Sequence, residues 1–230
     1  MMLTVIIPTL NVDKALEPTL SALMPAVMSG LIKQLVVSDG GSVDHTVTIA
    51  DDAGADIVSG PPGRGNQLAL GAAQARGDWL LFLHADTILE PGWDLEVQQF
   101  VAEAHAAEDL DRVAYFRFRL NDQHSAARWL ERIVSARCRV LALPYGDQGL
   151  LISKAFYEAI GGFKNMPLME DVELVRRVGR SRLIALRHAA TTSAARYRRE
   201  GYLKRMLRNA SCLAMWFIGV EPERIVRFYR

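Results

Sequence analysis

The sequence predicts an α/β fold: a mostly parallel central sheet flanked by helices, with a C-terminal helical extension. Three observations lead to this fold class. Apolar runs alternate with longer helical patterns through the first 83 residues, an order typical of βαβ units. The apolar runs are continuous, as in strands buried on both faces. Half of the 230 residues are apolar, which is enough for one sizeable core.

The first part of the chain is expected to contain four strands joined by three helices. Each strand is an apolar run that ends in a polar turn, and Gly54 and Gly77 stop the last two helices. Because the connections are helical, the strands should be parallel and the helices should cover both faces. The predicted strands cover 3–10, 33–41, 55–60 and 78–83, and the predicted helices cover 15–28, 44–54 and 64–77.

The second part of the chain has a less regular rhythm. Pro91 favours a helix start, 112–120 alternates like a strand with one solvated face, and 167–180 has acids at its start and bases at its end, as a helix dipole prefers. The predicted helices are 91–106, 125–142, 154–162 and 167–180, the strands are 112–120, 146–153 and 182–188, and two helices fill 198–230 around Gly219 and Pro222.

Composition and charge exclude several classes of protein. Charged residues make up 23% of the chain, and its aromatic and apolar content argues against disorder. The net charge of +1 hides 14 Lys/Arg against 3 Asp/Glu from Arg176 onward, and 13 against 23 before it. The basic part fits solvated helix faces, anionic ligand phosphates or an anionic membrane surface. With few interleaved aromatics and no DNA-binding motif, we expect no nucleic-acid partner.

The cysteines and the N-terminus indicate the compartment. Cys138 and Cys212 lack metal-binding spacing and predict buried thiols in a reducing compartment. The first residues, MMLTVIIPTL, predict a strand and not a secretory signal. We therefore expect a cytoplasmic protein.

An apolar stretch near the C-terminus, ASCLAMWFIGV (210–220), is too short to cross a bilayer, which takes about 20 residues. Three interpretations remain open: a helix packed on the domain, a homodimer interface, or a helix lying at the inner face of a membrane. In the last case five cations would touch lipid phosphates: Lys204, Arg205, Arg208, Arg224 and Arg227.

Polar residues follow each of the first four strands, and in an open parallel sheet ligands bind at this carboxyl edge. Alternatively, DGGS (39–42) could be only a turn before a helix capped by Asp44, and GRGN (63–66) is not a Walker loop. The candidate binding residues at the edge are Pro8, Thr9, Asn11, Asp39, Gly40, Arg64, Asn66, His84 and Asp86.

Four stretches together resemble the successive motifs of family 2 glycosyltransferases with the GT-A fold: TVIIPTLN, VVSDGGSVDHT, GRGNQLALGAAQARGDWLLFLHADT and MEDVELVRRV. The resemblance extends in order to about residue 180. YGDQGLLIS and TTSAARYRREG are most similar to a small bacterial subgroup described as arsenosugar-biosynthesis or radical-SAM-associated glycosyltransferases. The resemblance implies a nucleotide-sugar donor, most often a UDP-sugar, and a divalent cation, Mn²⁺ or Mg²⁺.

His84 and Asp86 are candidates for the cation site. In an extended segment residues i and i+2 face the same side, so both side chains can address one ion. Hard cations prefer carboxylate oxygens, and imidazole suits Mn²⁺ better than Mg²⁺. The family more often has Asp where His84 stands, so we expect Asp86 to be the ligand and His84 to be either a ligand or a neighbour of the nucleotide. Some family members use a late His near the metal; His188 is that candidate, or a structural histidine.

The acidic pair Glu170–Asp171 stands where the resemblance places the general base. Transfer with inversion needs a carboxylate that takes the acceptor's hydroxyl proton. Asp171 is the first choice and Glu170 the second, with helix capping as the alternative. Asp147 and Gln148 are expected at donor-sugar or acceptor hydroxyls, or simply in a turn.

The remaining candidates would bind the donor's nucleotide and diphosphate. Asp39 stands where the family's second strand contacts the nucleoside, with Thr9 and Asn11 beside it. Arg64 would meet a phosphate or the base, or be a surface residue. Arginine matches phosphate oxygens, so a mobile loop could close over the diphosphate with three of them: Arg196, Arg198 and Arg199.

These observations predict an inverting, metal-dependent transferase of a hexose from a nucleotide-sugar to an acceptor hydroxyl. The acceptor is either a small alcohol or lipid-linked. Residues 1–197 would form the catalytic domain, with 1–90 as its nucleotide-binding half and 91–197 as its acceptor half, and 198–230 the extension. A nucleotidyltransferase of similar fold is the alternative reaction, although PTLN stands where its glycine-rich signature would be. The second alternative is a nucleotide-sugar-binding protein without turnover.

Overall fold

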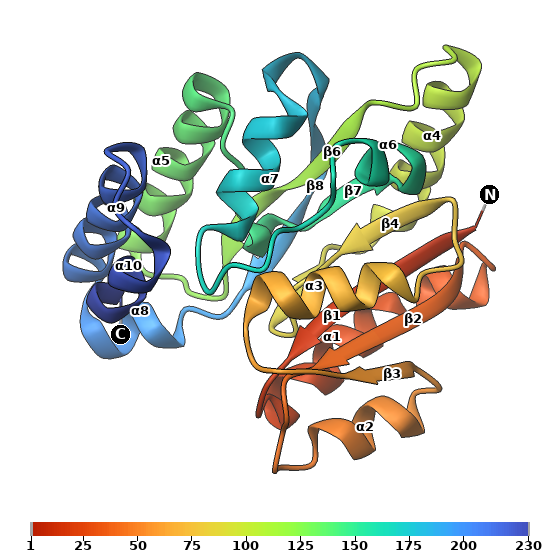
Figure 1. Cartoon of the computed structure of the whole chain (residues 1–230), viewed down its shortest axis with the longest axis horizontal. Helices are drawn as coiled ribbons and strands as arrows, with labels where there is room; N and C mark the ends of the chain where they lie inside the picture. The colour runs from red at the N-terminus through yellow and green to blue at the C-terminus, as the bar shows by residue number, and fades with distance from the viewer. Residues whose placement is uncertain (1, 230) are drawn as a thin grey trace.

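The computed structural model describes residues 2–229 and contains an eight-stranded mixed sheet with helices on both faces (Figure 1). The strands are β1 (Leu3–Thr9), β2 (Ile32–Asp39), β3 (Asp56–Ser59), β4 (Trp79–Phe82), β5 (Thr87–Leu89), β6 (Val113–Leu120), β7 (Leu150–Ser153) and β8 (Leu183–Thr192). The α-helices are α1 (Asp13–Met28), α2 (Thr46–Asp52), α3 (Arg64–Ala73), α4 (Trp93–Ala106), α5 (Ser125–Leu141), α6 (Lys154–Ala159), α7 (Glu170–Val178), α8 (Ala195–Glu200), α9 (Tyr202–Phe217) and α10 (Pro222–Tyr229).

The strand order is β3-β2-β1-β4-β7-β6-β8-β5. The first four strands are parallel, as predicted, and their carboxyl ends meet at one edge. β7 then runs antiparallel to β4 and to β6, so the start of β7 lies beside the end of β4. This reversal brings the residues just before β7 to the same edge as those that follow β1, β2 and β4.

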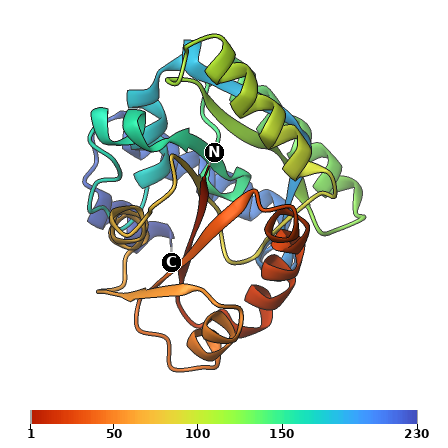
Figure 2. The same cartoon turned by 90° about the vertical axis from the view of Figure 1, so that its right-hand side faces the viewer.

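Two apolar cores cover the two faces of the sheet. α1 and α4 pack on one face through residues such as Leu16 and Val97, and α3, α6 and α7 pack on the other through residues such as Leu68 and Val172. Figure 2 shows α1 and α4 on the opposite side of the strands from α3 and α6. The central strands are buried on both faces, which explains their continuous apolar runs. The predicted α/β class is confirmed.

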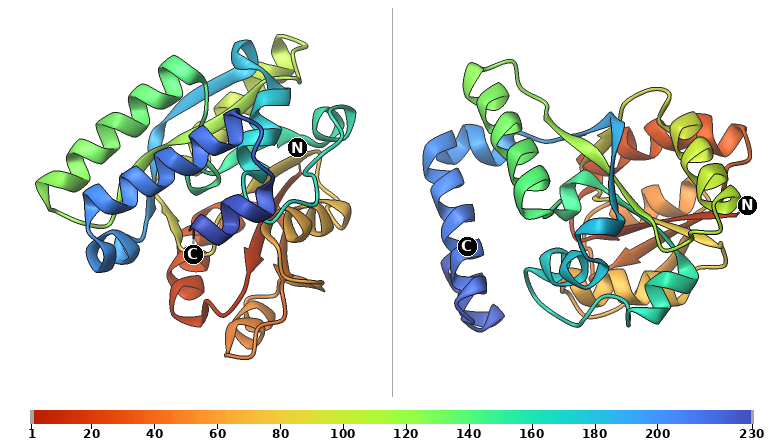
Figure 3. Two further views of the ribbon diagram at one scale, coloured as in Figure 1. Left: turned by 60° about the vertical axis from the view of Figure 1, so that its left-hand side comes forward. Right: turned by 90° about the horizontal axis from the view of Figure 1, so that it is seen from above.

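The C-terminal helices form a separate layer. α9 and α10 pack on the second core through Cys212 and Ile225, and α5 covers the end of β6 through Leu130 and Val134. Figure 3 shows α5 and α9 side by side at one end of the molecule. Among the described residues, no helix combines the length and the apolar character needed to span a membrane.

Three sequence predictions differ from the structure in detail. The strand predicted over 146–153 begins only at Leu150, because 146–148 forms a 3-10 turn. Segment 112–120 has a solvated side only near its end, at Arg117, because α5 and β8 cover the rest. β5 was not predicted, since three residues carry no clear period, and its pairing partner β8 continues to Thr192, beyond the predicted end at 188.

Substitution of Leu81 by alanine should destabilise the protein strongly. Leu81 is fully buried in the central strand β4, and a Leu→Ala change at such a site costs about 2–5 kcal/mol of unfolding free energy because it leaves a cavity. Leu95→Ala on α4, where the side chain is 67% exposed, is the matched control and should change stability little. Equal denaturation midpoints for the two variants in urea would contradict this assignment of the core.

Candidate active site

The carboxyl ends of β1 and β2 are held together by the side chain of Asp39. Its Oδ1 accepts hydrogen bonds from the Thr9 hydroxyl (2.9 Å) and the Ser42 hydroxyl (2.5 Å), and its Oδ2 accepts from the backbone N–H groups of Gly41 and Ser42 (2.8 and 2.7 Å). Burial would raise the pKa of Asp39, but these hydrogen bonds hold it below its usual value. Asp39 therefore stays ionised and fixes the turn.

Two further residues complete this edge. Asn11 has a positive φ of 51° and accepts a hydrogen bond from the Val43 N–H, so the β1–α1 and β2–α2 turns are joined. Gln67 of α3, which was not predicted, donates to the carbonyls of Thr9 and Ser38 (2.7 and 2.9 Å). A Cβ on Gly40 would lie only 3.1 Å from the Gln67 amide, so this position favours glycine. Pro8 is half-buried within β1.

The residues after β4 meet the turn before β7. A Cβ added to Gly146 would lie 2.6 Å from His84 Nε2, so backbone and imidazole are in close contact. The N–H of Gly146 donates to Asp171 Oδ2 (2.8 Å). Burial, with the charges of Arg64 and Arg196, lowers the pKa of His84 well below its ordinary value, so the ring is neutral. Its Nε2 is buried and has no hydrogen-bond partner among residues 2–229.

Glu170 is a buried carboxylate with little compensation. It is 1% exposed, neither carboxylate oxygen has a hydrogen-bond partner in the described chain, and Arg64 Nε lies 3.6 Å away. Burial and the neighbouring Asp171 raise the pKa of Glu170 to about 7, although Arg64 opposes the shift. Met169, directly before it, has a positive φ of 66°, which is uncommon for a non-glycine residue and is often found at functional sites.

Asp147 lies in the 3-10 turn next to this pair. Burial raises its pKa to about 6, the Arg137 guanidinium counteracts the shift, and the charges of Asp171 and Asp86 add to it. Its Oδ1 is buried and unpartnered in the described structure. Arg137 stacks 3.4 Å above the ring of Tyr145 and donates to the Leu143 carbonyl, so it supports the turn. The carboxylates of Asp147, Glu170 and Asp171 therefore lie near one another at this edge.

Asp86 lies half-buried at the end of the β4–β5 turn, beside Lys14 and Pro18 of α1 and Ser193 after β8. Its charge acts on both Asp147 and Arg64, which places it within electrostatic reach of the Glu170–Asp171 pair. Since β1 separates β2 from β4, Asp39 lies about 10 Å from this segment across the sheet. The three predicted residues thus share one edge, although Asp86 and Asp171 line separate pockets.

A divalent cation fits this arrangement if phosphate oxygens supply most of its ligands. Residues 2–229 contain no cluster of three or more His, Cys, Asp or Glu side chains arranged to hold a metal alone. However, Asp86 offers a half-buried carboxylate, and His84 stands two residues before it with an Nε2 that has no partner in the described chain. The charge of Asp86 also acts on the buried Asp147, whose Oδ1 is unpartnered among the described residues. The pKa values of Asp147 and Glu170 are raised although arginines oppose the shift, so an added positive charge is favourable here.

The three predicted diphosphate arginines face different ways. The charge of Arg196 acts on His84, so Arg196 is within reach of the edge. Arg198 acts on Asp122 and Tyr202, and Arg199 pairs with Glu200 at 3.6 Å. They lie on the helix α8 and not in a loop, and a helix points successive side chains in different directions.

Three other predicted residues bind side chains or backbone carbonyls of the protein itself. His188 Nδ1 lies 2.7 Å from Glu96, and its position on β8 is about 13 Å along the strand from Thr192, which pairs beside Asp86. His188 is therefore not brought to the predicted cation site. Gln148 is buried and bonds to the Phe116 carbonyl and Arg137. Asn66 donates to the Pro61 carbonyl.

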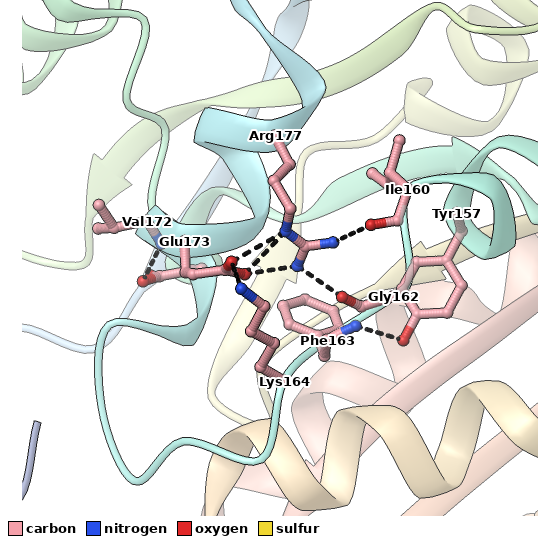
Figure 4. Close-up of polar contacts among 9 residues, drawn as sticks. Tyr157, Ile160, Gly162, Phe163, Lys164, Val172, Glu173 and Arg177 are labelled. Atoms are coloured by element: carbon pink, nitrogen blue, oxygen red, sulfur yellow. Dashed lines mark hydrogen bonds and ion pairs between the residues drawn. The ribbon is translucent and has the colours of Figure 1, made fainter.

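A polar network holds the loop that leads into α7 (Figure 4). Arg177 donates to the carbonyls of Ile160 and Gly162 and pairs with Glu173, which also pairs with Lys164. Glu170 and Asp171 begin this same helix, so the network fixes the helix that carries them. Neither Arg177 nor Arg137 was predicted to support the site, because the position of an arginine in the sequence does not reveal which backbone carbonyls it will bind.

Glu170→Gln should stabilise the protein at alkaline pH. Because the folded-state pKa of Glu170 lies above that of an unfolded carboxyl, its ionisation disfavours folding as pH rises through about 7. The variant should therefore unfold at a higher temperature than the parent at pH 8, and the difference should shrink toward pH 5. Glu17→Gln, at an exposed position on α1, is the control and should show no such trend. A pH-independent difference would contradict a desolvated Glu170.

The chain is similar in sequence to proteins of a known family. The family model described as glycosyl transferase family 2 matches residues 4–158, which ends before the Glu170–Asp171 pair. Glucosyl-3-phosphoglycerate synthase of Mycobacterium tuberculosis is 33% identical over 95 residues, covering 37% of this chain and 29% of the relative. A PGL/p-HBAD biosynthesis glycosyltransferase of Mycobacterium bovis is 33% identical over 123 residues, covering 47% and 44%. The chain thus spans less than half the length of these curated relatives.

Solved structures agree on the fold. The crystal structure of M. tuberculosis glucosyl-3-phosphoglycerate synthase in complex with Mn²⁺, UDP and glucosyl-3-phosphoglycerate has a TM-score of 0.57 and 23% identity, and covers 84% of this chain and 70% of that one. S. aureus TarS 1-349 in complex with UDP has a TM-score of 0.65 and 16% identity, covering 90% and 64%. The chain therefore belongs to glycosyl transferase family 2 and has the GT-A fold.

Proposed function

We propose that this protein transfers a sugar from a nucleotide-sugar donor to an acceptor hydroxyl, with inversion at the anomeric carbon and with a divalent cation. One observation carries the proposal. Glu170 and Asp171 line one pocket with a neutral histidine, His84, beyond the carboxyl end of β4, Asp147 lies in the adjoining turn, and Asp86 lines a neighbouring pocket at the same edge. Ligands bind at this edge in open α/β sheets, and buried carboxylates with raised pKa values, as at Asp147 and Glu170, are typical of catalytic sites.

The donor's nucleoside would bind across the ends of β1 and β2. Asp39 there is ionised, and the turn that it organises presents the backbone of Gly40 and Gly41 beside Thr9. Arg64 begins α3 and is about one-third exposed, so it can meet a phosphate while its Nε side faces Glu170. Arg196 approaches the same region from α8. These are groups that bind anions and ribose hydroxyls.

The cation would bind at Asp86, with Mn²⁺ as first choice and Mg²⁺ as second. When bound, it supplies Lewis-acid stabilisation of the negative charge that grows on the leaving diphosphate. A neutral His84 adds no charge of its own at this point, and its unpartnered Nε2 can accept or donate one hydrogen bond to the donor.

Asp171 would act as the general base. Its Oδ2 accepts from the Gly146 N–H and its Oδ1 from the Val172 N–H, so the carboxylate is oriented by two backbone donors. The backbone bonds leave lone pairs available for the acceptor's hydroxyl proton. Glu170 is more deeply buried, and its raised pKa disfavours the ionised form that a base needs. It is therefore the second choice.

The similar structures support a UDP-sugar as the first donor to test, since glucosyl-3-phosphoglycerate synthase was solved with UDP and Mn²⁺ and TarS 1-349 with UDP. The acceptor is a hydroxyl of a small alcohol or of a lipid-linked compound. The finer sequence resemblance, to the arsenosugar-biosynthesis or radical-SAM-associated subgroup, remains part of the proposal and names no acceptor.

Donor turnover separates this function from its alternatives. Purified protein with Mn²⁺ and a panel of UDP- and GDP-sugars should slowly hydrolyse one donor even without an acceptor, and EDTA should stop the reaction. Consumption of nucleoside triphosphates with release of pyrophosphate would indicate a nucleotidyltransferase instead. Tight donor binding with no turnover, with or without a panel of alcohols as acceptors, would indicate a nucleotide-sugar-binding protein that is not an enzyme.

A further inference from the structure

Helix α9 carries an apolar stripe on its outer face, defined here as Leu203, Leu207, Ala210, Ala214, Phe217 and Ile218. Their spacing of three and four residues places them on one side of the helix. The four large side chains are 65%, 60%, 50% and 78% exposed in chain order. From Leu203 to Ile218 the stripe is about 22 Å long.

The stripe residues belong to none of the apolar cores, although the Arg176 guanidinium of α7 lies 5.2 Å over the ring of Phe217. The inner face of α9 is already packed: Cys212 lies in the second core, and the buried Arg205 stacks 4.3 Å over the ring of Tyr229 and pairs with Glu200 at 3.4 Å. A surface helix normally turns polar residues outward, and an apolar outer face is a sign of an interaction site.

The neighbouring helix α5 also carries exposed apolar side chains at the same end of the molecule. α5 contacts α9 and lies beside it in Figure 3. Trp129, Val140 and Leu141 of α5 are 53%, 66% and 53% exposed. The other exposed apolar side chains lie in loops, in β5 and on other helices, with Met24, Val27 and Met28 together on the last turns of α1.

Charge decides which partner fits. Helices α5, α8, α9 and α10 together carry twelve Lys and Arg residues against three Glu, and α9 contains no acidic residue. A second copy docked through the same face would bring like charges together, which is unfavourable. An anionic phospholipid surface offers phosphates for the cations and an acyl boundary for the apolar stripe.

We propose that the α9 stripe binds the surface of an anionic phospholipid bilayer, with α9 lying in the plane of the membrane. The basic side chains around it, such as Lys204 and Arg227, contact the lipid phosphates. Helices α9 and α10 lie at the end of the molecule toward which β1 and β2 point (Figure 1). The candidate site is at the carboxyl ends of these strands, so a membrane-bound transferase would reach a lipid-linked acceptor. That consequence rests on the proposed function, whereas the membrane binding does not.

Co-sedimentation of the full chain with vesicles tests the proposal without any substrate. The protein should pellet with phosphatidylcholine vesicles that contain about one third phosphatidylglycerol, and much less with phosphatidylcholine alone. Raising NaCl from about 0.05 M to 0.5 M should weaken the binding, because salt screens the charges.

A triple variant, Leu203→Gln with Leu207→Gln and Ile218→Gln, should lower the affinity for the anionic vesicles by about tenfold or more. The matched control replaces three other exposed apolar residues, each at least 67% exposed, by glutamine and should bind like the parent: Met28, Val43 and Leu95. Thermal unfolding verifies that both triples are folded.

Three results would overturn the proposal. The first is a parent that does not bind anionic vesicles at low salt, and the second is equal loss of binding in the two triples. The third is a parent that light scattering shows to be a dimer and that the stripe triple converts to a monomer, because a second copy would then cover the stripe. None of these outcomes depends on donor turnover, so they leave the proposed function to its own test.

Discussion

Asp86→Ala is expected to abolish cation-dependent binding of the nucleotide. Asp86 is a half-buried carboxylate shortly after β4, and its negative charge helps to raise the pKa of the buried Asp147. In the proposed site, removal of this carboxylate would take away the protein's direct oxygen ligand and leave phosphate oxygens and water. Titration calorimetry of UDP with and without Mn²⁺ measures the effect: the parent should bind UDP at least about tenfold more tightly with the metal, and the variant should lose this difference.

Asp52→Ala is the matched control, because this aspartate is exposed at the end of α2, away from the predicted site. It should keep the full dependence on Mn²⁺. If Asp86→Ala also keeps it, Asp86 is not a ligand, and the cation must bind elsewhere on the chain.

Asp171→Asn should leave donor affinity nearly unchanged and reduce the transfer rate by about 10²–10⁴. The amide is nearly the same size as the carboxylate and its oxygen can still accept from the Gly146 N–H, so the turn before β7 should survive. It cannot take a proton from the acceptor. Single-turnover rates with saturating UDP-sugar, together with donor dissociation constants, separate the two effects.

The same measurements on Glu170→Gln distinguish the two acids. Because Glu170 is 1% exposed, its replacement should change the rate less than Asp171→Asn does. Near-normal turnover of Asp171→Asn together with a large loss in Glu170→Gln would transfer the role of the base to Glu170.

The sequence predicted the first half of the fold well because its signals are local and repeated. Each of the strands β1 to β4 is an apolar run followed by a polar turn, and each maps onto the predicted segment within a few residues. The antiparallel direction of β7 was not predictable, because its short apolar run carries no information about its pairing partner. β5 was missed because its three residues are too few to show a clear period.

The positions of site residues that follow strands could be predicted from the sequence. The hydrogen-bond partners of polar side chains could not. Asp39, His84 and Asp86 lie at the predicted edge because strand ends determine their positions, and Asp171 reaches this edge from the first turn of α7. Gln148 and His188 have suitable chemistry, but the Phe116 carbonyl and Glu96 bind them first. Such pairings depend on tertiary contacts between residues 32 and 92 positions apart, which no local pattern encodes.

A crystal structure with Mn²⁺ and an unhydrolysed UDP-sugar tests the central claim most directly. The account predicts the ion about 2.1 Å from an Asp86 carboxylate oxygen, bridged to the diphosphate. The uridine should lie at Asp39, and Asp171 should face the anomeric carbon from the side opposite the phosphate. A nucleotide bound away from the ends of β1, β2 and β4, or an ion with no contact to Asp86, would contradict it.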